Sequence, residues 1–286
     1  LGANPEEIYF TAGGSESDNW ALKATAEAYK EKGNHIITTK IEHHAILQAC
    51  QAIERLGYPV TYLPVNQQGG VTSEALSRII TDNTKLVSVM MANNEIGTVE
   101  PIEELARIAH AHGALIHTDA VQAVGHIPID VNALGVDLLS ASAHKFNGPK
   151  GIGFLYIRRG TSIHPFADGG AQEFGMRAGT ENVAAIVGMS VALKKNCDHM
   201  VEIGARLHKL EQVFLGTLQQ AGIDFVRNGS ENRVPGNISI SIRGASGEML
   251  LHRLDLKGIA ISTGSACDSV NPQVSHVIQA IGVPNE

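Results

Sequence analysis

The sequence has few of the features that mark disulfide-stabilised or membrane-bound proteins. It holds only three cysteines, Cys50, Cys197 and Cys267, which are widely spaced and form no CxxC pair. A disulfide framework or a cysteine zinc site is therefore not expected. No apolar run approaches the roughly 20 residues of a membrane-spanning helix, and the first residues lack a signal-peptide pattern. We therefore expect a cytoplasmic protein with no membrane partner.

Positive charge is also scarce, since 22 Lys and Arg stand against 29 Asp and Glu, for a formal net charge of −7. Proteins that bind nucleic acids normally carry a basic excess that neutralises phosphates, so no nucleic-acid partner is expected. Hydrophobic residues make up 43% of the 286 residues, which is enough for a sizeable core without disulfides. The composition favours a globular enzyme that acts on small molecules or proteins.

The usual nucleotide-binding and serine-hydrolase motifs are missing as well. No GxGxxG follows a strand-like run, and neither GxxxxGK[ST] nor GxSxG occurs, so the function must use other residues at the ends of the strands. The chain also starts at Leu1, in loop-like residues, rather than at methionine. We therefore expect it to be part of a longer protein.

Strand-like runs alternate with helix-like segments through the first half of the chain. Strands are predicted at residues 35–39, 59–65, 85–92, 114–119 and 136–143, and amphipathic helices closed by glycine lie between several of them. This alternation indicates βαβ crossovers and a mostly parallel sheet. Residues 151–159 predict one more strand, of undetermined direction.

The second half has a different organisation. A long helix is predicted to reach about Gln220 and to be followed by shorter elements, namely strands at 224–226, 236–242 and 259–263 and a helix at 247–256. This change predicts a large domain at residues 1–200 and a smaller α+β C-terminal domain at residues 201–286. The fold class is α/β, with a mostly parallel sheet sandwiched by helices.

Ligands of a parallel sheet bind beyond the carboxyl ends of its strands, so polar residues there are the first candidates for function. They are His43, His44, Asn93, Asn94, Asp119, Gln122, Ser142, His144 and Lys145. A partly desolvated Lys145 has a neutral amine that can form a Schiff base with an aldehyde; a solvated lysine is the simpler alternative. Asp119 favours the first interpretation, because a carboxylate can keep the ring nitrogen of pyridoxal phosphate protonated; its alternative is a helix N-cap.

A phosphate site for such a cofactor is predicted at the start of the first helix. Gly13 and Gly14 permit close backbone approach, Ser15 offers a hydroxyl, and the amides and dipole of a helix N-terminus favour a dianion. An ordinary capped helix after a glycine turn is the alternative.

Two further residue types have a possible role at this site. Side chains of the adjacent His43 and His44 diverge on a strand or a helix, which disfavours a metal and leaves stacking on a flat cofactor ring as the better use. Cys267 lies in "ISTGSACDS", whose small residues suit a thiolate nucleophile that must reach a ligand. A small residue in a turn is the alternative for Cys267, and no metal site is expected.

Seven segments together, in order and spacing, resemble the motifs of the NifS/IscS-type cysteine desulfurases, which belong to the class V branch of fold-type I pyridoxal-phosphate enzymes. They are "TAGGSESDN", "IEHHA", "ANNEIGTVEPI", "HTDAVQAVG", "SASAHKFNGPKG", "RAGTEN" and "STGSACDS". The resemblance runs from residue 1 to about residue 282. It implies the fold-type I architecture with pyridoxal 5'-phosphate as the cofactor.

Site roles follow from the resemblance by matched position. It implies that Lys145 holds the cofactor as a Schiff base, that Asp119 pairs with the pyridine nitrogen, and that His43 stacks on the ring and moves protons. It also implies the following contacts: Asn94 and Gln122 to the phenolic oxygen or substrate, Gly14, Ser15, Ser142 and His144 to the phosphate, and Thr180 to the phosphate of the partner subunit's cofactor. The last contact implies a homodimer.

The implied activity is conversion of L-cysteine to L-alanine. Lys145 removes the Cα proton, and the Cys267 thiolate takes the substrate sulfur as a persulfide for an acceptor protein, either an iron-sulfur scaffold or a thiolation enzyme. The family's first strand and its C-terminal arginine, which holds the substrate carboxylate, have no counterpart in these residues. Alternatives are a selenocysteine lyase, another class V enzyme, or a noncatalytic sulfur-transfer platform.

Overall fold

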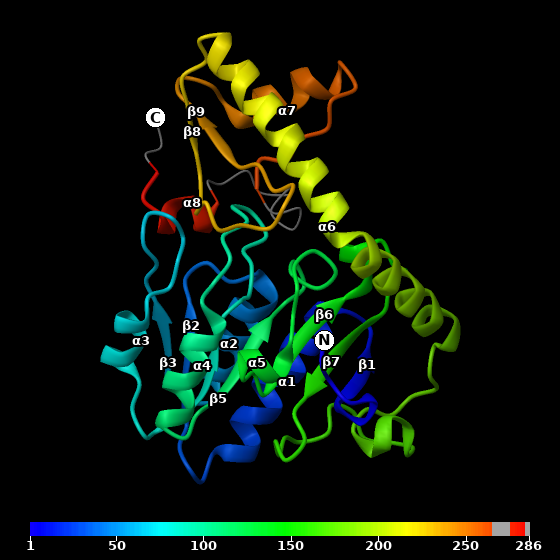
Figure 1. Ribbon diagram of the computed structural model, residues 1–286. Helices are drawn as coiled ribbons and strands as arrows, with labels where there is room; N and C mark the ends of the chain where they lie inside the picture. Colours follow the sequence, from blue (N-terminus) through cyan, green and yellow to red (C-terminus); the bar gives the residue numbers. More distant parts are fainter. Residues whose placement is uncertain (265–274, 284–286) are drawn as a thin grey trace.

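The computed structural model describes residues 1–264 and 275–283. A seven-stranded sheet, in the order β1-β7-β6-β5-β4-β2-β3, forms its centre, and helices cover both faces (Figure 1). Strands β2 and β3, β2 and β4, β4 and β5, and β5 and β6 pair in parallel. The predicted mostly parallel α/β fold is confirmed. The strands are β1 (Ile8–Thr11), β2 (His35–Thr39), β3 (Val60–Leu63), β4 (Thr84–Ser88), β5 (Leu115–Asp119), β6 (Leu138–Ser142) and β7 (Gly153–Ile157).

Two hydrophobic cores hold the helices against this sheet. On one face, α1 and α2 bury Trp20, Leu22 and Ile53 against the strands; on the other, α3, α4 and the start of α6 bury a second, larger set of aliphatic side chains. Because both faces of the sheet are covered, the side chains on both sides of the central strands are buried, with no alternation of buried and exposed positions. The helices here are α1 (Gly14–Tyr29), α2 (His44–Arg55), α3 (Ser73–Ile79), α4 (Ile102–Ala111) and α5 (Val131–Leu134), with short 3-10 turns η1 (Pro5–Glu7), η2 (Ala143–Phe146) and η3 (Gln172–Gly175).

One edge of the sheet is antiparallel. Strand β7, whose direction the sequence left open, runs antiparallel to β6, and β1 pairs antiparallel with β7. The four residues of β1 were not predicted as a strand, because so short a run carries no clear alternation and pairs only with β7, more than 140 positions later in the chain.

The C-terminal part is built on the long helix α6 (Val183–Gln220). Strands β8 (Phe225–Arg227) and β9 (Ile240–Ile242) form a two-stranded antiparallel sheet, and α7 (Gly247–Asp255) follows them. The predicted strand at 259–263 is wrong: the residues are irregular, because no strand edge pairs with them in the β8-β9 sheet. Residue 200 lies inside α6, which is continuous through it, and the division there stays a prediction.

Helix α8 (His276–Ala280) returns the chain to the large sheet. Val277 and Ile281 pack in a third core with Ile41, Met90 and Ile96. These partners lie just beyond the carboxyl ends of β2 and β4, so the end of the described chain contacts the same sheet edge as the predicted ligand site.

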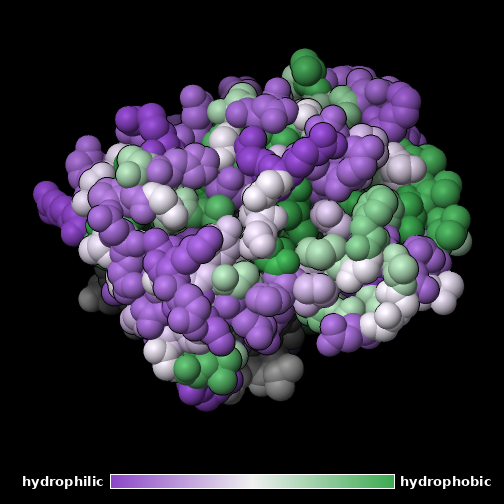
Figure 2. Space-filling model, turned by 90° about the horizontal axis from the view of Figure 1, so that it is seen from below, coloured by the Kyte–Doolittle hydropathy of each residue, from purple (hydrophilic) through white to green (hydrophobic). Residues whose placement is uncertain are grey.

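The surface of α6 is unusually apolar near its start. Val183, Val187 and Val191 are 54 to 64% exposed, and their spacing of four residues places them on one side of the helix. Seen from below, most of the molecule is hydrophilic and hydrophobic residues gather at the right edge (Figure 2), the side on which the first half of α6 lies in Figure 1. No helix in the described ranges is long and apolar enough to span a bilayer.

Gly153 at the start of β7 couples the fold to the start of α1. A Cβ there would lie 2.3 Å from Ala141 O and 2.8 Å from the Gly13 Cα, so Gly153→Ala forces two backbones apart. We expect it to lower the free energy of unfolding by about 1–3 kcal/mol, as for overpacking, measured by urea denaturation. Gly216→Ala is the control: no atom lies within 4 Å of the added Cβ on α6, and we expect stabilisation of up to about 1 kcal/mol. Equal effects of both changes would contradict this account.

Candidate active site

The carboxyl ends of β2, β4, β5 and β6 lie side by side at one edge of the sheet. Backbone hydrogen bonds continue past the strands, from Met91 N to Asp119 O at 2.8 Å and from Ala120 N to Ser140 O at 3.0 Å. Glu42, in the turn between β2 and α2, accepts the Met90 N–H at 3.0 Å. The segments that carry the candidate residues are therefore held together here.

The start of α1 lies against two of these strand ends. Gly13 is the N-cap, with φ 147° and no side-chain capping bond, so the first amides of α1 have no intrahelical acceptor and no side-chain cap. A Cβ on Gly14 would lie 2.6 Å from Val121 Cγ2, so any other residue here would force the Val121 side chain to shift. Ser15 is exposed beside it. The result is a backbone cradle suited to an anion.

Ser142 and His144 complete this cradle from the end of β6. The Ser142 Oγ and His144 Nδ1 lie 2.9 Å apart, and a Cβ on Gly13 would be 3.5 Å from the Ser142 hydroxyl. Partial burial, followed by the charges of Lys145 and Lys150, lowers the pKa of His144. His144 is therefore neutral at pH 7, and the two lysines supply the positive potential that favours a phosphate.

Lys145 lies on η2, and its backbone is fixed from two directions. His126 Nε2 lies 2.8 Å from the Lys145 carbonyl oxygen, and Asn196 of α6 donates to the Phe146 carbonyl at 2.6 Å. Asn147 ends the turn in the left-handed region at φ 64°, a conformation that asparagine tolerates better than most residues. The Lys145 side chain is exposed in this chain, not desolvated as predicted from the sequence.

Asp119 is buried at the end of β5, and its Oδ1 accepts the Val121 N–H at 2.9 Å. Burial raises its pKa to about 6, and the Val121 amide and the positive charge of Lys145 act in the opposite direction. The amine and the carboxylate expected at the two ends of the cofactor are therefore close enough to interact electrostatically.

His43 is the N-cap of α2, and its Nδ1 accepts the Ala45 N–H at 3.1 Å. A neutral ring in this position carries its proton on Nε2. The rings of His43 and His44 are 6.3 Å apart and tilted by 59°, whereas the His44 and His276 rings are 5.0 Å apart. Within the described ranges, no three His, Cys, Asp or Glu side chains are grouped as a metal would require.

The remaining candidates divide into two groups. Asn94 and Gln122 are half-buried beside these strand ends. Both polar atoms of the Asn93 side chain instead hold the local backbone: its Nδ2 donates to Ile41 O at 2.9 Å, and its Oδ1 accepts the amide hydrogens of Glu95 and Ile96. Thr180 is exposed before α6, and the described chain has no hydrogen bond between it and another candidate. Cys267 lies outside the described residues.

Several residues near the site were missed in the sequence. Ser275 donates to Glu95 at 2.5 Å and His276 lies 3.0 Å from Glu42 O, so α8 attaches beside His43. Asp18 of α1 and His117 of β5 are fully buried on the same side of the sheet. An acidic residue on the apolar side of an amphipathic helix was the available signal for Asp18, whereas the α8 contacts join residues about 180 and 234 positions apart and left no local pattern.

The residues present fit pyridoxal phosphate. The backbone cradle at Gly13 and Gly14 suits its phosphate, Asp119 suits a protonated ring nitrogen, and Lys145 suits its aldehyde. Each of these is an observed feature of the chain's own geometry, and together they match three separate parts of the cofactor.

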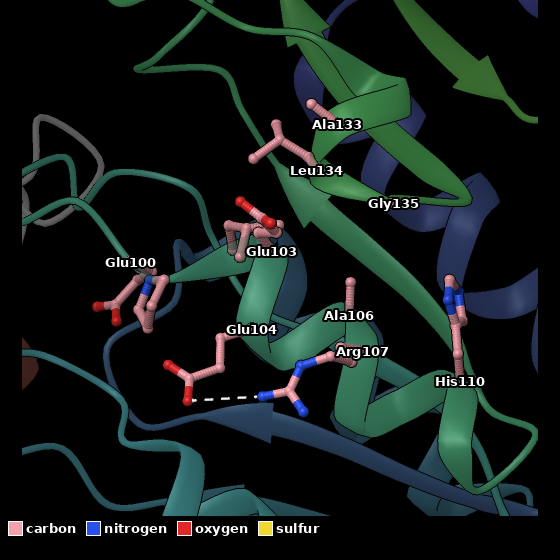
Figure 3. Close-up of a pocket in the computed structure, with 11 residues that line it drawn as sticks. Glu100, Glu103, Glu104, Ala106, Arg107, His110, Ala133, Leu134 and Gly135 are labelled. Atoms are coloured by element: carbon pink, nitrogen blue, oxygen red, sulfur yellow. Dashed lines mark ion pairs between the residues drawn. The ribbon is translucent and has the colours of Figure 1, made fainter.

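A surface hollow lies away from the candidate site, on the outer side of α4 and α5. It encloses about 770 Å³ and is lined by these residues: Glu100, Pro101, Ile102, Glu103, Glu104, Ala106, Arg107, His110, Ala133, Leu134 and Gly135 (Figure 3). Its one drawn ion pair, Arg107 with Glu104, is 3.9 Å long and exposed. None of the candidate residues lines it, so this hollow is separate from the candidate site.

Comparisons with known proteins agree with this geometry. Residues 1–282 match the family described as Aminotransferase class-V. "Cysteine desulfurase IscS" of Dictyoglomus turgidum is 51% identical over 287 residues, covering 100% of this chain and 73% of that protein. The protein of the same name from Methanosarcina thermophila is 49% identical, covering 100% of this chain and 71% of its own length.

Solved structures show the same fold. A "NifS-like protein" superposes with a TM-score of 0.92 at 39% identity, covering 100% of this chain and 75% of that one. A structure described as "SspA in complex with cysteine" has a TM-score of 0.86 at 36% identity, covering 99% and 79%. Because the family match spans almost every residue and the relatives match along the whole chain, this protein belongs to the class-V aminotransferase family of pyridoxal-phosphate enzymes.

Proposed function

We propose that this protein is a cysteine desulfurase that uses pyridoxal 5'-phosphate to convert L-cysteine to L-alanine. The observation that carries the proposal is the convergence of the uncapped α1 N-terminus, Lys145 and Asp119 at one sheet edge. Relatives named as cysteine desulfurases match the whole chain at about half identity, and one solved relative is described as a complex with cysteine.

When bound, pyridoxal phosphate supplies an electron-accepting ring that stabilises negative charge at the substrate Cα. Asp119 holds the ring nitrogen protonated, with its own orientation fixed by the Val121 amide. Lys145 would hold the aldehyde carbon of the cofactor, and its amine is the base that would remove the substrate Cα proton. The cradle of Gly14, Ser15, Ser142 and His144 fixes the phosphate, while Asn94 and Gln122 contact the phenolic oxygen or the substrate.

His43 acts as the ring-stacking residue and as a proton donor. Since its Nδ1 already accepts a backbone amide, the proton it can donate is on Nε2. Cys267, in its thiolate form, attacks the substrate sulfur. The S–S bond of a persulfide forms as the substrate Cβ–S bond breaks, and the electron pair of that bond stays with the carbon fragment, which takes up a proton and leaves as alanine. The persulfide then passes to an acceptor protein, for which an iron-sulfur scaffold fits the name of the relatives and a thiolation enzyme is the alternative.

We also propose that the protein is a cytoplasmic homodimer. The exposed valines of α6 and the exposed Phe174 are large apolar side chains open to solvent, of the kind that marks protein contacts when they gather. Thr180 lies between Phe174 and the first of these valines in the chain, which supports its contact with the phosphate of the partner's cofactor. Cys50 and Cys197 are unpaired, as suits a reducing compartment.

Lys145→Ala tests the cofactor assignment. Without the amine, we expect loss of the covalent cofactor absorbance and a fall in alanine and sulfide release from L-cysteine by about 100-fold or more, because general-base catalysis is removed. Absorbance spectra and product assays on purified protein measure both. A wild-type protein that takes up no pyridoxal phosphate would rule out the proposal.

Cys267→Ala tests the sulfur-transfer step separately. We expect normal cofactor absorbance but loss of the protein-bound persulfide and a large fall in sulfide release with a thiol reductant. Cys197→Ala is the matched control, since this thiol is exposed on α6 and unpaired, and it should leave both readings unchanged. Undiminished sulfide release by Cys267→Ala would exclude the persulfide mechanism.

Val187→Asp tests the dimer. A charge in the centre of the apolar stripe on α6 should weaken self-association by about 10-fold or more, because each 1.4 kcal/mol of lost contact is tenfold in affinity. Light scattering at several protein concentrations measures the mass. Leu56→Asp is the control, as Leu56 is 75% exposed at the end of α2. A monomeric wild type, or equal effects of both changes, would contradict the proposed interface.

A further inference from the structure

A chain of buried polar side chains crosses three strands of the sheet beside Asp119. The Nδ1 and Nε2 atoms of His117 on β5 lie 2.8 Å from the Ser88 hydroxyl of β4 and 2.9 Å from the Ser140 hydroxyl of β6. All three side chains are inaccessible to solvent. Both ring nitrogens therefore already have a hydroxyl partner, and a neutral imidazole satisfies this arrangement.

Asp18 of α1 lies directly against this chain. Its Oδ1 is 3.8 Å from His117 Nε2 and has no hydrogen-bond partner among the described residues. The residue is 1% exposed. An ionised carboxylate without a donor on one oxygen costs far more to bury than a neutral carboxyl does, so the geometry favours the neutral acid.

Asp18 and Asp119 are neighbours on the same side of the sheet. His117 and Asp119 are two residues apart on β5 and therefore point to the same face, which α1 covers with Asp18. When two buried carboxyls lie close together, ionisation of one disfavours ionisation of the other. Asp119 accepts the Val121 amide and has the positive charge of Lys145 nearby, whereas Asp18 has only the neutral Ser140 hydroxyl to oppose the effect of burial, so the charge belongs on Asp119.

We propose that Asp18 is a positioning residue that keeps its proton, with His117 held neutral between two serines, so that Asp119 is the only carboxylate beneath the cofactor ring. The purpose assigned to Asp18 rests on the proposed function. The protonation state of Asp18 does not rest on the proposed function, because every group that determines it belongs to the chain itself. Fixing one negative charge at Asp119 secures a protonated ring nitrogen when the cofactor is bound.

The pKa shifts of the buried groups in this cluster agree with a neutral Asp18 and a neutral His117. Burial, followed by the charge of Asp119, raises the pKa of Asp18 well above its usual range, with Ser140 opposing and Glu42 adding to the shift. Burial lowers the pKa of His117 to about 3. Glu42, after β2, has a pKa raised by burial to about 8. The other titratable groups facing this cluster are Asp119 on β5, Lys145 on η2 and, next to Glu42, Cys50 on α2.

The raised pKa gives a defined pH dependence of stability. The raised pKa of Asp18 costs the protein no stability below about pH 4, because Asp18 is then protonated in the unfolded chain as well. As the pH rises towards the folded-state pKa, the unfolded chain ionises and the folded state loses relative stability. Asp18→Asn removes this loss, because asparagine keeps the shape of the neutral acid and cannot ionise.

The experiment is a comparison of melting temperatures of cofactor-free wild type and Asp18→Asn from pH 4 to 8. We expect the variant to gain stability relative to wild type steadily as the pH rises. Asp137→Asn is the matched control, a buried aspartate that accepts the Ile116 amide at 2.9 Å and pairs with Arg158 at 3.6 Å. Asp137→Asn weakens that ion pair and should be less stable than wild type. The same loss in Asp18→Asn would overturn the proposal.

Two further measurements keep the test decisive if Asp18→Asn folds poorly. In wild type, nitrogen NMR of the His117 ring should show one neutral form from pH 5 to 8; a cationic ring in this range would mean that Asp18 is ionised and would overturn the proposal. In an Asp119→Asn background, the stability gain from Asp18→Asn should shrink, because the neighbouring charge is gone. Failure to bind pyridoxal phosphate would count against the proposed function alone, since the stability and NMR series use cofactor-free protein.

Discussion

The close approach of the α1 N-terminus to the carboxyl ends of β5 and β6 is the constraint on which the site depends. Gly13 and Gly14 permit it, because a side chain on Gly14 would overlap Val121 and one on Gly153 would overlap Gly13. Once α1 starts there, its uncapped amides face Ser142, and its buried side delivers Trp20 to the core and Asp18 to the polar cluster. One backbone contact thus determines where the backbone cradle for an anion lies, where Trp20 packs in a hydrophobic core, and that Asp18 lies near Asp119.

Much of this arrangement could be predicted from the sequence because it depends on local patterns. Strands β5 and β6 end in Asp119 and Ser142, Asn94 follows a few residues after β4, and parallel pairing brings such residues to one edge. The glycine pair before α1 is similarly local. Order and spacing of the motifs then gave the family, which the match over residues 1–282 confirms. The individual roles of the site residues stay predictions.

The rest could not be predicted because it depends on contacts that are distant in the chain. Strand β1 pairs with β7, and residues 259–263 look like a strand but have no edge to pair with. Lys145 was expected to be desolvated, yet a single chain leaves it exposed, because burial there depends on what covers η2. The network of Asp18 and His117 joins α1 to β5, and the sequence signals only the acid on the apolar side of α1, not its contact with a distant strand.

The loop after β4 serves the two ends of the site at once. Asn93 fixes its shape by accepting the Glu95 and Ile96 amides, which leaves Asn94 beside the strand ends. Glu95 then binds the Ser275 hydroxyl, and a Cβ on Gly264 would lie 3.9 Å from the same carboxylate. Gly264 and Ser275 therefore both lie beside one residue of this loop. A change in the loop after β4 therefore acts together on the position of Asn94 beside the strand ends and on the contact of Ser275 with Glu95.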